Sequence, residues 1–309
     1  MKTAKNTRPD EEILDGLLQL ERRRVFFSFD TGGVPPATVS AEDRVWREHN
    51  TELHPFREIL VILDGDMQFQ LAGQVYAGRS GDMALIDSFE AHDRFHPPSV
   101  RDALTLWLVC SPRTISCLVN RTREGKNKLL MHFEFARSEF CAMLNSVWRD
   151  ALNDRKSPSV AKLEICGVVD VVMGAFAEKI MTSGYEEVRR LGEVQNRQYL
   201  TVMSAMAYVS GHPNENPQLG ELAKKAGYST VHFARLFRQY AGCGFREYVD
   251  VVRMELYRKM YSVKHMHKKE IAVELGFSSS SSLIHWLRTA DARKAERLEA
   301  ARSGGDREG

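Results

Sequence analysis

The hydrophobic positions change their period along the chain, and each change predicts a different kind of element. From Asp10 to Arg24, Leu and Ile recur at the three- and four-residue spacing of an amphipathic helix. Short apolar or alternating segments follow, separated by turns rich in Gly and Asp. The predicted strands are Val25–Phe29, Ile59–Leu63, Met67–Leu71, Gln74–Ala77, Met83–Ile86, Thr105–Val109 and Ile115–Asn120. Many short strands joined by such turns predict an antiparallel barrel or jelly roll.

The helical period returns at about Phe133 and predicts a series of helices. One contains Trp148 and ends at Ser157-Pro158. The next, Leu163–Ile180, is apolar over a broad face, which is typical of a helix buried against another body. That body is either the barrel or a second subunit, and the pattern leaves both open. A further helix is predicted over Leu200–Val209.

The stretch from Leu219 to Arg288 contains one pattern twice. Each copy has a short helix, a turn with a glycine (Gly227 or Gly276), a serine suited to capping, and a second helix. Leu222-Ala223 corresponds to Ile271-Ala272, Phe233 to Leu283, Phe237 to Leu287, and Arg238 to Arg288. A helix over Phe245–Tyr261 links the copies. The repeated layout is that of a helix-turn-helix, whose second helix enters a DNA major groove.

Composition and charge are compatible with this interpretation. The chain has 309 residues, of which 43% are hydrophobic and 27% charged, as in an ordinary globular protein. From Asn196 onward 18 Lys and Arg stand against 12 Asp and Glu, whereas the preceding part has 25 against 29. Five scattered cysteines without a CxxC pair favour buried thiols in a reducing cytoplasm. Neither a signal peptide nor a membrane span is expected, because the chain has no apolar stretch of suitable length.

The repeated region resembles the DNA-binding domain of AraC/XylS-type transcription regulators. The resemblance rests on the A-x-x-x-G-x-S turn, Phe237-Arg238, Gly242, Tyr248, Arg253 and Ile271-Ala272 through Ser278. The preceding segment resembles the cupin-like effector domain of such regulators. That resemblance is carried by His54-Pro-Phe-Arg-Glu58, Gly65, Gly81-Asp82 and His92.

Together these patterns predict an α+β protein with two domains. Residues 1–132 are expected to be the cupin-like effector-binding domain, and residues 133–192 a helical linker or dimerisation region. Residues 193–302 are expected to be the all-α double helix-turn-helix domain.

The resemblance implies two recognition helices in successive major grooves. The expected DNA-binding residues are Thr230, Val231, His232, Ala234, Arg235, Arg238, Ser280, Ser281, Ile284, His285 and Arg288. Arg235 is the candidate for reading guanine, Val231 for meeting a thymine methyl, and Arg238 with Arg288 for clamping phosphates. The alternative is that Arg235 and His285 are only solvated helix charges. Thr289–Glu296 lacks the Gly and Thr-Pro usual in the family, and Ser282 replaces a larger residue, so the second copy is expected to pack less well.

The barrel mouth supplies the candidate ligand site. The expected ligand-binding residues are Trp46, His54, Arg57, Glu58, His92, Phe95 and His96, with Trp107 either joining them or belonging to the core. Aromatic faces beside charged groups suit a sugar or a related polar metabolite. Glu52, His54, Glu58 and His92 form an alternative metal-ligand set. Binding without a metal is favoured because Glu52 stands where the cupin pattern has its first His.

The resulting prediction is a ligand-controlled, sequence-specific transcription regulator, with an activator favoured over a repressor. It would be neither an enzyme nor dependent on a cofactor. Its partners would be duplex DNA, a small effector such as a carbohydrate, RNA polymerase by family resemblance, and a second copy of the chain as a homodimer. The alternatives are a metal-dependent cupin enzyme with an appended helical domain and a regulator with only one working motif.

Overall fold

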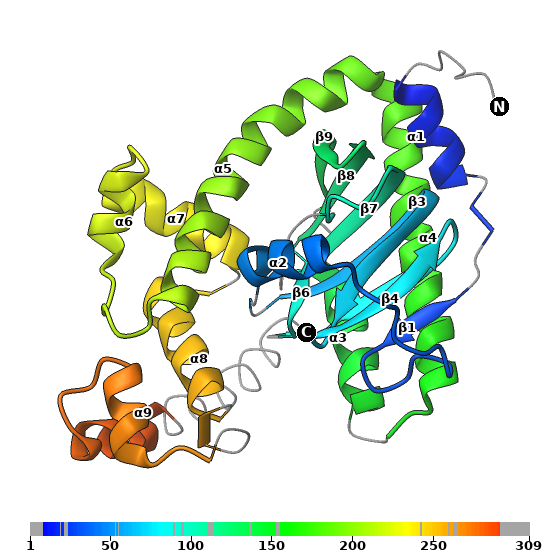
Figure 1. Ribbon diagram of the computed structural model, residues 1–309. Coiled ribbons are helices and arrows are strands. Elements are labelled where there is room, and N and C mark those ends of the chain that lie inside the picture. Colours follow the sequence, from blue (N-terminus) through cyan, green and yellow to red (C-terminus); the bar gives the residue numbers. More distant parts are fainter. Residues whose placement is uncertain are drawn as a thin grey trace, which may run out of the picture. The chain divides into compact units, whose positions relative to one another are not determined.

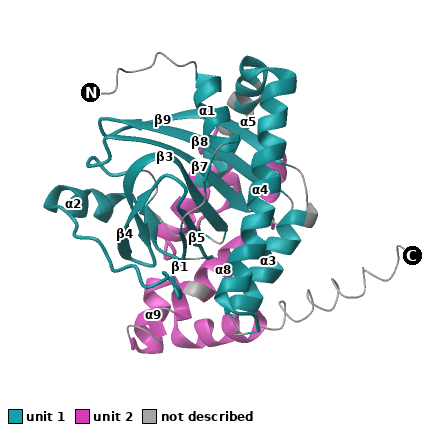
Figure 2. Cartoon of the chain, turned by 90° about the vertical axis from the view of Figure 1, so that its right-hand side faces the viewer, with its two compact units in different colours: residues 1–203, 239–242 teal, residues 204–238, 243–309 magenta. Residues whose placement is uncertain are grey.

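The computed structural model describes residues 9–18, 20–21, 24–52, 54, 56–88, 90–93, 96–110, 114–135, 138–152, 155–241, 243–258, 260–261 and 265–290. The chain divides into two compact units (Figure 2). Unit 1 comprises residues 1–203 and 239–242, and unit 2 comprises residues 204–238 and 243–309. Among the described helices, none is both long and apolar enough to cross a membrane.

Unit 1 is built on a mainly antiparallel sheet. Its strands are β1 (Val25–Phe27), β2 (Thr51–Glu52), β3 (Arg57–Leu71), β4 (Gln74–Arg79), β5 (Met83–Ile86), β6 (His92–Asp93), β7 (Asp102–Cys110), β8 (Ile115–Arg123) and β9 (Lys126–Phe135). The main order is β1-β5-β3-β7-β8-β9, with β4 and β6 pairing with β3 and β2 pairing with β6. Only β1–β5 is parallel among the described pairs. The described sheet is open, so closure into a barrel or jelly roll stays a prediction.

The segment Asp64-Gly65-Asp66 does not form the turn that its composition predicts. It lies inside β3, where the register with β7 shifts between Ile62 and Asp64. Gly65 has a φ of 88°, and a Cβ at this position would lie 2.3 Å from the backbone oxygen of Asp102. The glycine therefore allows a bulge against the neighbouring strand without reversing the chain.

Helices cover one face of the sheet (Figure 1). These are α1 (Pro9–Leu18), α3 (Ser138–Leu152) and α4 (Pro158–Ser183), and their apolar side chains form one core with Ile59, Val61 and Leu63 of β3. Trp148 and Phe176 are fully buried there. The expectation that the apolar helix packs on another body is thus met within the chain, although Leu163, Val171 and Met181 of α4 remain exposed. Ser157, which the sequence places at the end of the preceding helix, is the N-cap of α4, and α4 ends before Gly184.

The opposite face of the sheet has its own core and a helix that the hydrophobic pattern does not predict. Phe26, Leu60 and Phe69 belong to this core. The unexpected helix is α2 (Ala41–Asn50), which begins after the N-cap Ser40. Its buried positions are Asp43 and Arg47, which is why an apolar periodicity is missing.

The helices towards the C-terminus confirm the repeated pattern. α5 (Tyr185–Gly211) begins earlier than its apolar positions indicate. α6 (Leu219–Lys225) and α7 (Thr230–Ala241) form the first helix-turn-helix. α8 (Phe245–Arg258) links it to the second, which consists of α9 (Lys268–Glu274) and a helix over residues 280–290.

Candidate functional site

The helix α7 separates an apolar face from a solvent-exposed face. Phe233 and Phe237 are fully buried on one side. On the other side Val231 is 83% exposed, and Arg235 and Arg238 are exposed as well. Spacings of four and three residues place these three side chains on one stripe of the helix. Of the other predicted DNA contacts in this copy, Thr230 is exposed, and His232 and Ala234 are half-buried.

An aromatic cluster holds α7 in place. The ring of Phe237 meets those of Phe245 and Tyr248 edge-on, with centroids 5.3 and 5.4 Å apart. The Tyr248 hydroxyl donates to the backbone oxygen of Met206 at 3.3 Å. At the start of the helix, the Ser229 hydroxyl accepts from the His232 backbone N–H at 3.3 Å. A fixed helix of this kind presents its outer stripe as a rigid surface.

The second recognition helix, residues 280–290, repeats this arrangement with one extra residue in its turn. Its N-cap is Ser279, whose hydroxyl accepts from the Ser282 N–H at 3.1 Å. Ser281, His285 and Arg288 are exposed at the spacing of Val231, Arg235 and Arg238. Ser280 and Ile284 are half-buried.

The second copy is well packed in spite of its unusual composition. The indole N–H of Trp286 donates to Asp250 of α8 at 2.8 Å. Leu275 and Leu283 are fully buried beside it. Ser282 interacts through hydrogen bonds with other serines, so its small side chain serves the cap and not the core. The expected weaker packing is therefore not seen for the residues described, while the segment Thr289–Glu296 lies mostly outside them.

The two turn glycines share a backbone conformation but differ in surroundings. Gly227 has a φ of 74° and Gly276 a φ of 73°. A Cβ at Gly276 would lie 2.5 Å from the backbone oxygen of Asn214, whereas a Cβ at Gly227 would meet nothing within 4 Å. Arg253 fastens the same loop, because it donates to Asn216 Oδ1 at 3.0 Å and lies over the Phe277 ring at 5.2 Å.

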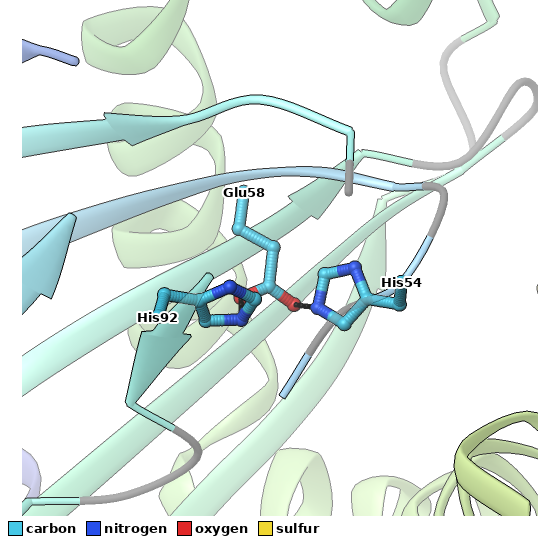
Figure 3. A group of neighbouring side chains, drawn as sticks. All are labelled: His54, Glu58 and His92. Atoms are coloured by element: carbon cyan, nitrogen blue, oxygen red, sulfur yellow. Dashed lines mark ion pairs between the residues drawn. The ribbon is translucent and has the colours of Figure 1, made fainter. Parts of the chain in front are cut away.

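A second candidate site lies in unit 1, where His54, Glu58 and His92 converge (Figure 3). Glu58 is on β3 and His92 on β6. His54 Nε2 lies 3.1 Å from Glu58 Oε1, and His92 Nε2 lies 3.4 Å from Glu58 Oε2. All three residues are buried. Burial raises the pKa of Glu58, but the charges and hydrogen bonds of the two imidazoles outweigh burial and hold it well below its usual range.

Two further predicted ligand-site residues continue from this cluster. The Trp107 ring lies near both His92 and His96, with centroids 6.4 and 6.3 Å away. His96 Nε2 is 3.0 Å from the Thr105 hydroxyl. Burial lowers the pKa of His96 to about 4, so this imidazole is neutral at pH 7.

Arg57, also predicted for the ligand site, does not join this cluster. Arg57 points to the helix-covered face, where its Nε lies 2.7 Å from Asp87 and its Nη1 lies 2.6 Å from Asn145 of α3. Arg57 and Glu58 differ in this way because side chains of adjacent strand residues point to opposite faces. Trp46 is half-buried on α2. Phe95 and the side chain of Glu52 lie outside the described residues.

A buried ion pair beside this site has no counterpart in the sequence-based prediction. Arg47 Nε lies 3.0 Å from Asp93 Oδ1, and both side chains are buried. Asp93 also accepts from the Gln70 backbone N–H at 3.1 Å. Burial raises the pKa of Asp93 to about 6, although Arg47 opposes this shift. In the sequence, only the position of Asp93 next to His92 indicates this pair. Its partner Arg47 is 46 residues away, so no local spacing links the two.

Comparison with known proteins identifies the C-terminal region. Residues 222–294 match the family model described as a helix-turn-helix domain. The probable transcription factor PqrA of Proteus vulgaris is 36% identical over 69 residues, which are 22% of this chain and 57% of that protein. The regulatory protein PocR of Salmonella typhimurium is 31% identical over 77 residues, 25% of each chain. The matched part of this chain therefore spans a little over half of PqrA and a quarter of PocR.

Solved structures of regulators are also similar, at low scores. An AraC-type transcriptional regulator from Chromobacterium violaceum is 22% identical, with 38% of this chain and 99% of that one covered and a TM-score of 0.27. ToxT from Vibrio cholerae is 12% identical, with 78% and 88% covered and a TM-score of 0.27. The residues that match the family model, 222–294, contain nearly all of the two helix-turn-helix motifs seen in the structure. The C-terminal part of the chain is an AraC/XylS-type helix-turn-helix domain.

Proposed function

We propose that the chain is a sequence-specific transcription regulator that binds duplex DNA through α7 and the helix over residues 280–290. The observation that carries this proposal is the repeated exposed stripe. Val231, Arg235 and Arg238 have their counterparts in Ser281, His285 and Arg288, and the opposite faces of both helices are buried.

Within this stripe Arg235 is proposed to read bases. A guanidinium can donate to guanine O6 and N7 together, while Val231 suits a thymine methyl group. Arg238 and Arg288 are proposed to bind phosphates, which position the protein without selecting a sequence. Thr230, His232, Ala234, Ser280, Ser281, Ile284 and His285 complete the proposed interface. The serine-rich second helix is expected to add affinity more than specificity.

Replacing Arg235 with alanine should weaken binding to the cognate duplex by about 1–3 kcal/mol, or roughly 5- to 150-fold, because the bidentate base contact is lost. Binding to unrelated DNA should change much less. Operator selection followed by a footprinting titration measures both. Arg246→Ala on α8 removes the same charge from another exposed position and serves as the control. Unchanged affinity and sequence preference in Arg235→Ala would exclude this role.

We further propose that unit 1 binds a small polar effector, with a sugar as the favoured class. The half-buried Trp107 near His92 and His96 offers a ring face next to hydrogen-bonding groups, which is how proteins commonly hold polar ring compounds. His54, Glu58, Trp46 and Phe95 remain candidates for the same site. Arg57 is left out of this proposed site because its side chain contacts α3.

A thermal-shift screen of sugars and sugar acids tests the effector proposal. A ligand at 100 times its Kd should stabilise the folded chain by about 2.7 kcal/mol, seen as a higher Tm. The shift should shrink in Trp107→Leu. A hit that stabilises wild type and Trp107→Leu equally would place its site elsewhere.

The exposed side of α4 is proposed to bind a second copy of this chain. Val160, Leu163, Val171 and Met181 are exposed on it, together with Gly167 and Gly174, where an added Cβ would meet nothing. Along α4, Val160 and Met181 lie at equal distances on either side of the midpoint between residues 170 and 171. Gly167 and Gly174 do so as well. Two antiparallel copies of α4 would therefore place Val160 near Met181 and Gly167 near Gly174 of the second copy, as a two-fold interface requires, and Leu163 near its Glu178.

Leu163→Glu should convert the proposed dimer into a monomer, since it removes an apolar contact and places a second carboxylate near Glu178 of the other copy in each half of the interface. Leu163 is 74% exposed, so the change should leave the folded subunit intact. Sedimentation velocity over a concentration series measures the association. Val45→Glu alters an exposed apolar residue of α2 and provides the comparison. A wild-type chain that is monomeric at all concentrations would rule out this interface.

The remaining proposals rest on the type of the DNA-binding domain. We propose that the protein acts in the cytoplasm, that it activates transcription through contact with RNA polymerase, and that its DNA-binding domain begins near residue 193. In vitro transcription from a selected operator distinguishes activation from repression.

A further inference from the structure

We propose that His54, Glu58 and His92 bind one divalent transition-metal ion. Their ligand atoms all lie within 4.8 Å of one another, and the three residues are buried. Nothing in the proposed DNA-binding function requires a metal, so this inference stands on unit 1 alone. The absence of the His-x-His pair favoured a metal-free site, but the folded chain brings three suitable ligands together without the residue at Glu52.

The spacing of the three groups fits a shared ion. Ligand atoms about 2.1 Å from a tetrahedral metal ion are separated by about 3.4 Å. The two imidazole nitrogens lie 3.1 and 3.4 Å from the two oxygens of the Glu58 carboxylate. Both rings approach from different segments, one just before β3 and one on β6, and face the same carboxylate (Figure 3).

The orientation of His92 supplies a second, independent argument. Its Nδ1 lies 2.8 Å from the backbone oxygen of Glu90, a contact that requires an N–H on Nδ1. In the neutral ring the lone pair is then on Nε2, and it points towards Glu58 Oε2 at 3.4 Å. A lone pair and a carboxylate oxygen repel each other unless a proton or a metal ion lies between them. Metal-bound histidines commonly donate their other N–H to a backbone carbonyl in this way.

The ligand types select the class of ion. Two imidazoles and one carboxylate suit Zn²⁺, Fe²⁺, Mn²⁺, Co²⁺ or Ni²⁺, whereas Ca²⁺ and Mg²⁺ prefer oxygen ligands. Three protein ligands leave at least one coordination position for water or for a polar group of a small molecule. Trp107, 6.4 Å from the His92 ring, would lie beside such a molecule. The competing interpretation is a proton on His92, which would form an imidazolium–carboxylate pair with no metal.

Metal analysis of the full chain separates the two interpretations. The purified protein is stripped with a chelator, loaded with Zn²⁺ or Co²⁺, desalted and measured by mass spectrometry of the metal. One ion per chain is expected, and the Co²⁺ form should show an absorption spectrum of nitrogen and oxygen ligation. Glu58→Gln and His92→Gln should lose the ion. His96→Gln, a buried histidine outside the cluster, and His212→Gln, an exposed one, should keep it.

Two results would overturn the proposal. One is a wild-type chain that retains no ion after desalting, which would favour the protonated pair. The other is equal retention by Glu58→Gln and His92→Gln, which would mean adventitious binding. If these variants fail to fold, X-ray absorption of the wild-type Co²⁺ form decides, because two imidazoles must appear among its ligands. A failure of the Arg235 experiment leaves this test unaffected.

Discussion

Gly276→Ala should disrupt the second helix-turn-helix, whereas Gly227→Ala should be tolerated. The two glycines occupy equivalent turns with φ values of 73° and 74°, so alanine costs about 1–2 kcal/mol of left-handed strain at either position. Only at Gly276 would the new Cβ also collide with backbone, 2.5 Å from the Asn214 oxygen. Backbone displacement of this kind adds about 1–3 kcal/mol.

Hydrogen exchange resolved by segment measures this difference, because a chain of two units need not unfold in one step. Protection should fall in α9 and residues 280–290 for Gly276→Ala, and only slightly in α6 and α7 for Gly227→Ala. The two variants form a matched pair with the same chemical change. Equal loss of protection in the two variants would contradict this prediction. It would show that the loop at Asn214 moves away from the new Cβ and does not restrict the residue at position 276.

Arg47→Met should destabilise unit 1 by about 3–5 kcal/mol, since it leaves the buried carboxylate of Asp93 without its charged partner. Arg44→Met on the exposed side of α2 should change the stability little. The double variant Arg47→Met/Asp93→Leu should recover much of the loss, because no buried charge remains. Urea unfolding followed by tryptophan fluorescence measures these effects. No recovery in the double variant would contradict the assigned cause.

The same pair gives a pH dependence with a defined sign. Burial raises the folded-state pKa of Asp93 to about 6, above its value of 3.8 in an unfolded chain. A raised pKa contributes stability that is present below pH 3.8 and is lost as the pH rises through 6. Without Arg47 the pKa rises further, so the stability lost in Arg47→Met should be larger at pH 8 than at pH 5.

The sequence predicts the double helix-turn-helix well because its signals are local. Helical periodicity, turn glycines and capping serines all lie within a few residues of the elements they specify. The turn of the second copy has one more residue, before Ser279, than the turn of the first. The second recognition helix nevertheless keeps a serine N-cap and the same exposed stripe.

Unit 1 is predicted less completely, because its decisive contacts are distant in sequence. α2 was missed because its buried side chains are Asp43 and Arg47, whose burial depends on partners elsewhere in the chain. Asp64-Gly65-Asp66 has the composition of a turn, but pairing with β7 keeps it in a strand. His54 and Glu58 can be linked by their spacing, whereas His92 could be grouped with them only through the cupin resemblance, because their juxtaposition depends on the position of β6.

The distribution of thiols makes the two units chemically distinguishable. Cys110, Cys117, Cys141 and Cys166 are buried in unit 1, while Cys243 in unit 2 is half-buried. Burial raises the pKa values of Cys110 and Cys117, which suppresses the reactive thiolate further. Under native conditions an alkylating reagent should thus modify Cys243 first. The other four should react only at the rate at which unit 1 opens. Because an effector bound to unit 1 would slow this opening, the rate of alkylation of these native cysteines would report effector binding.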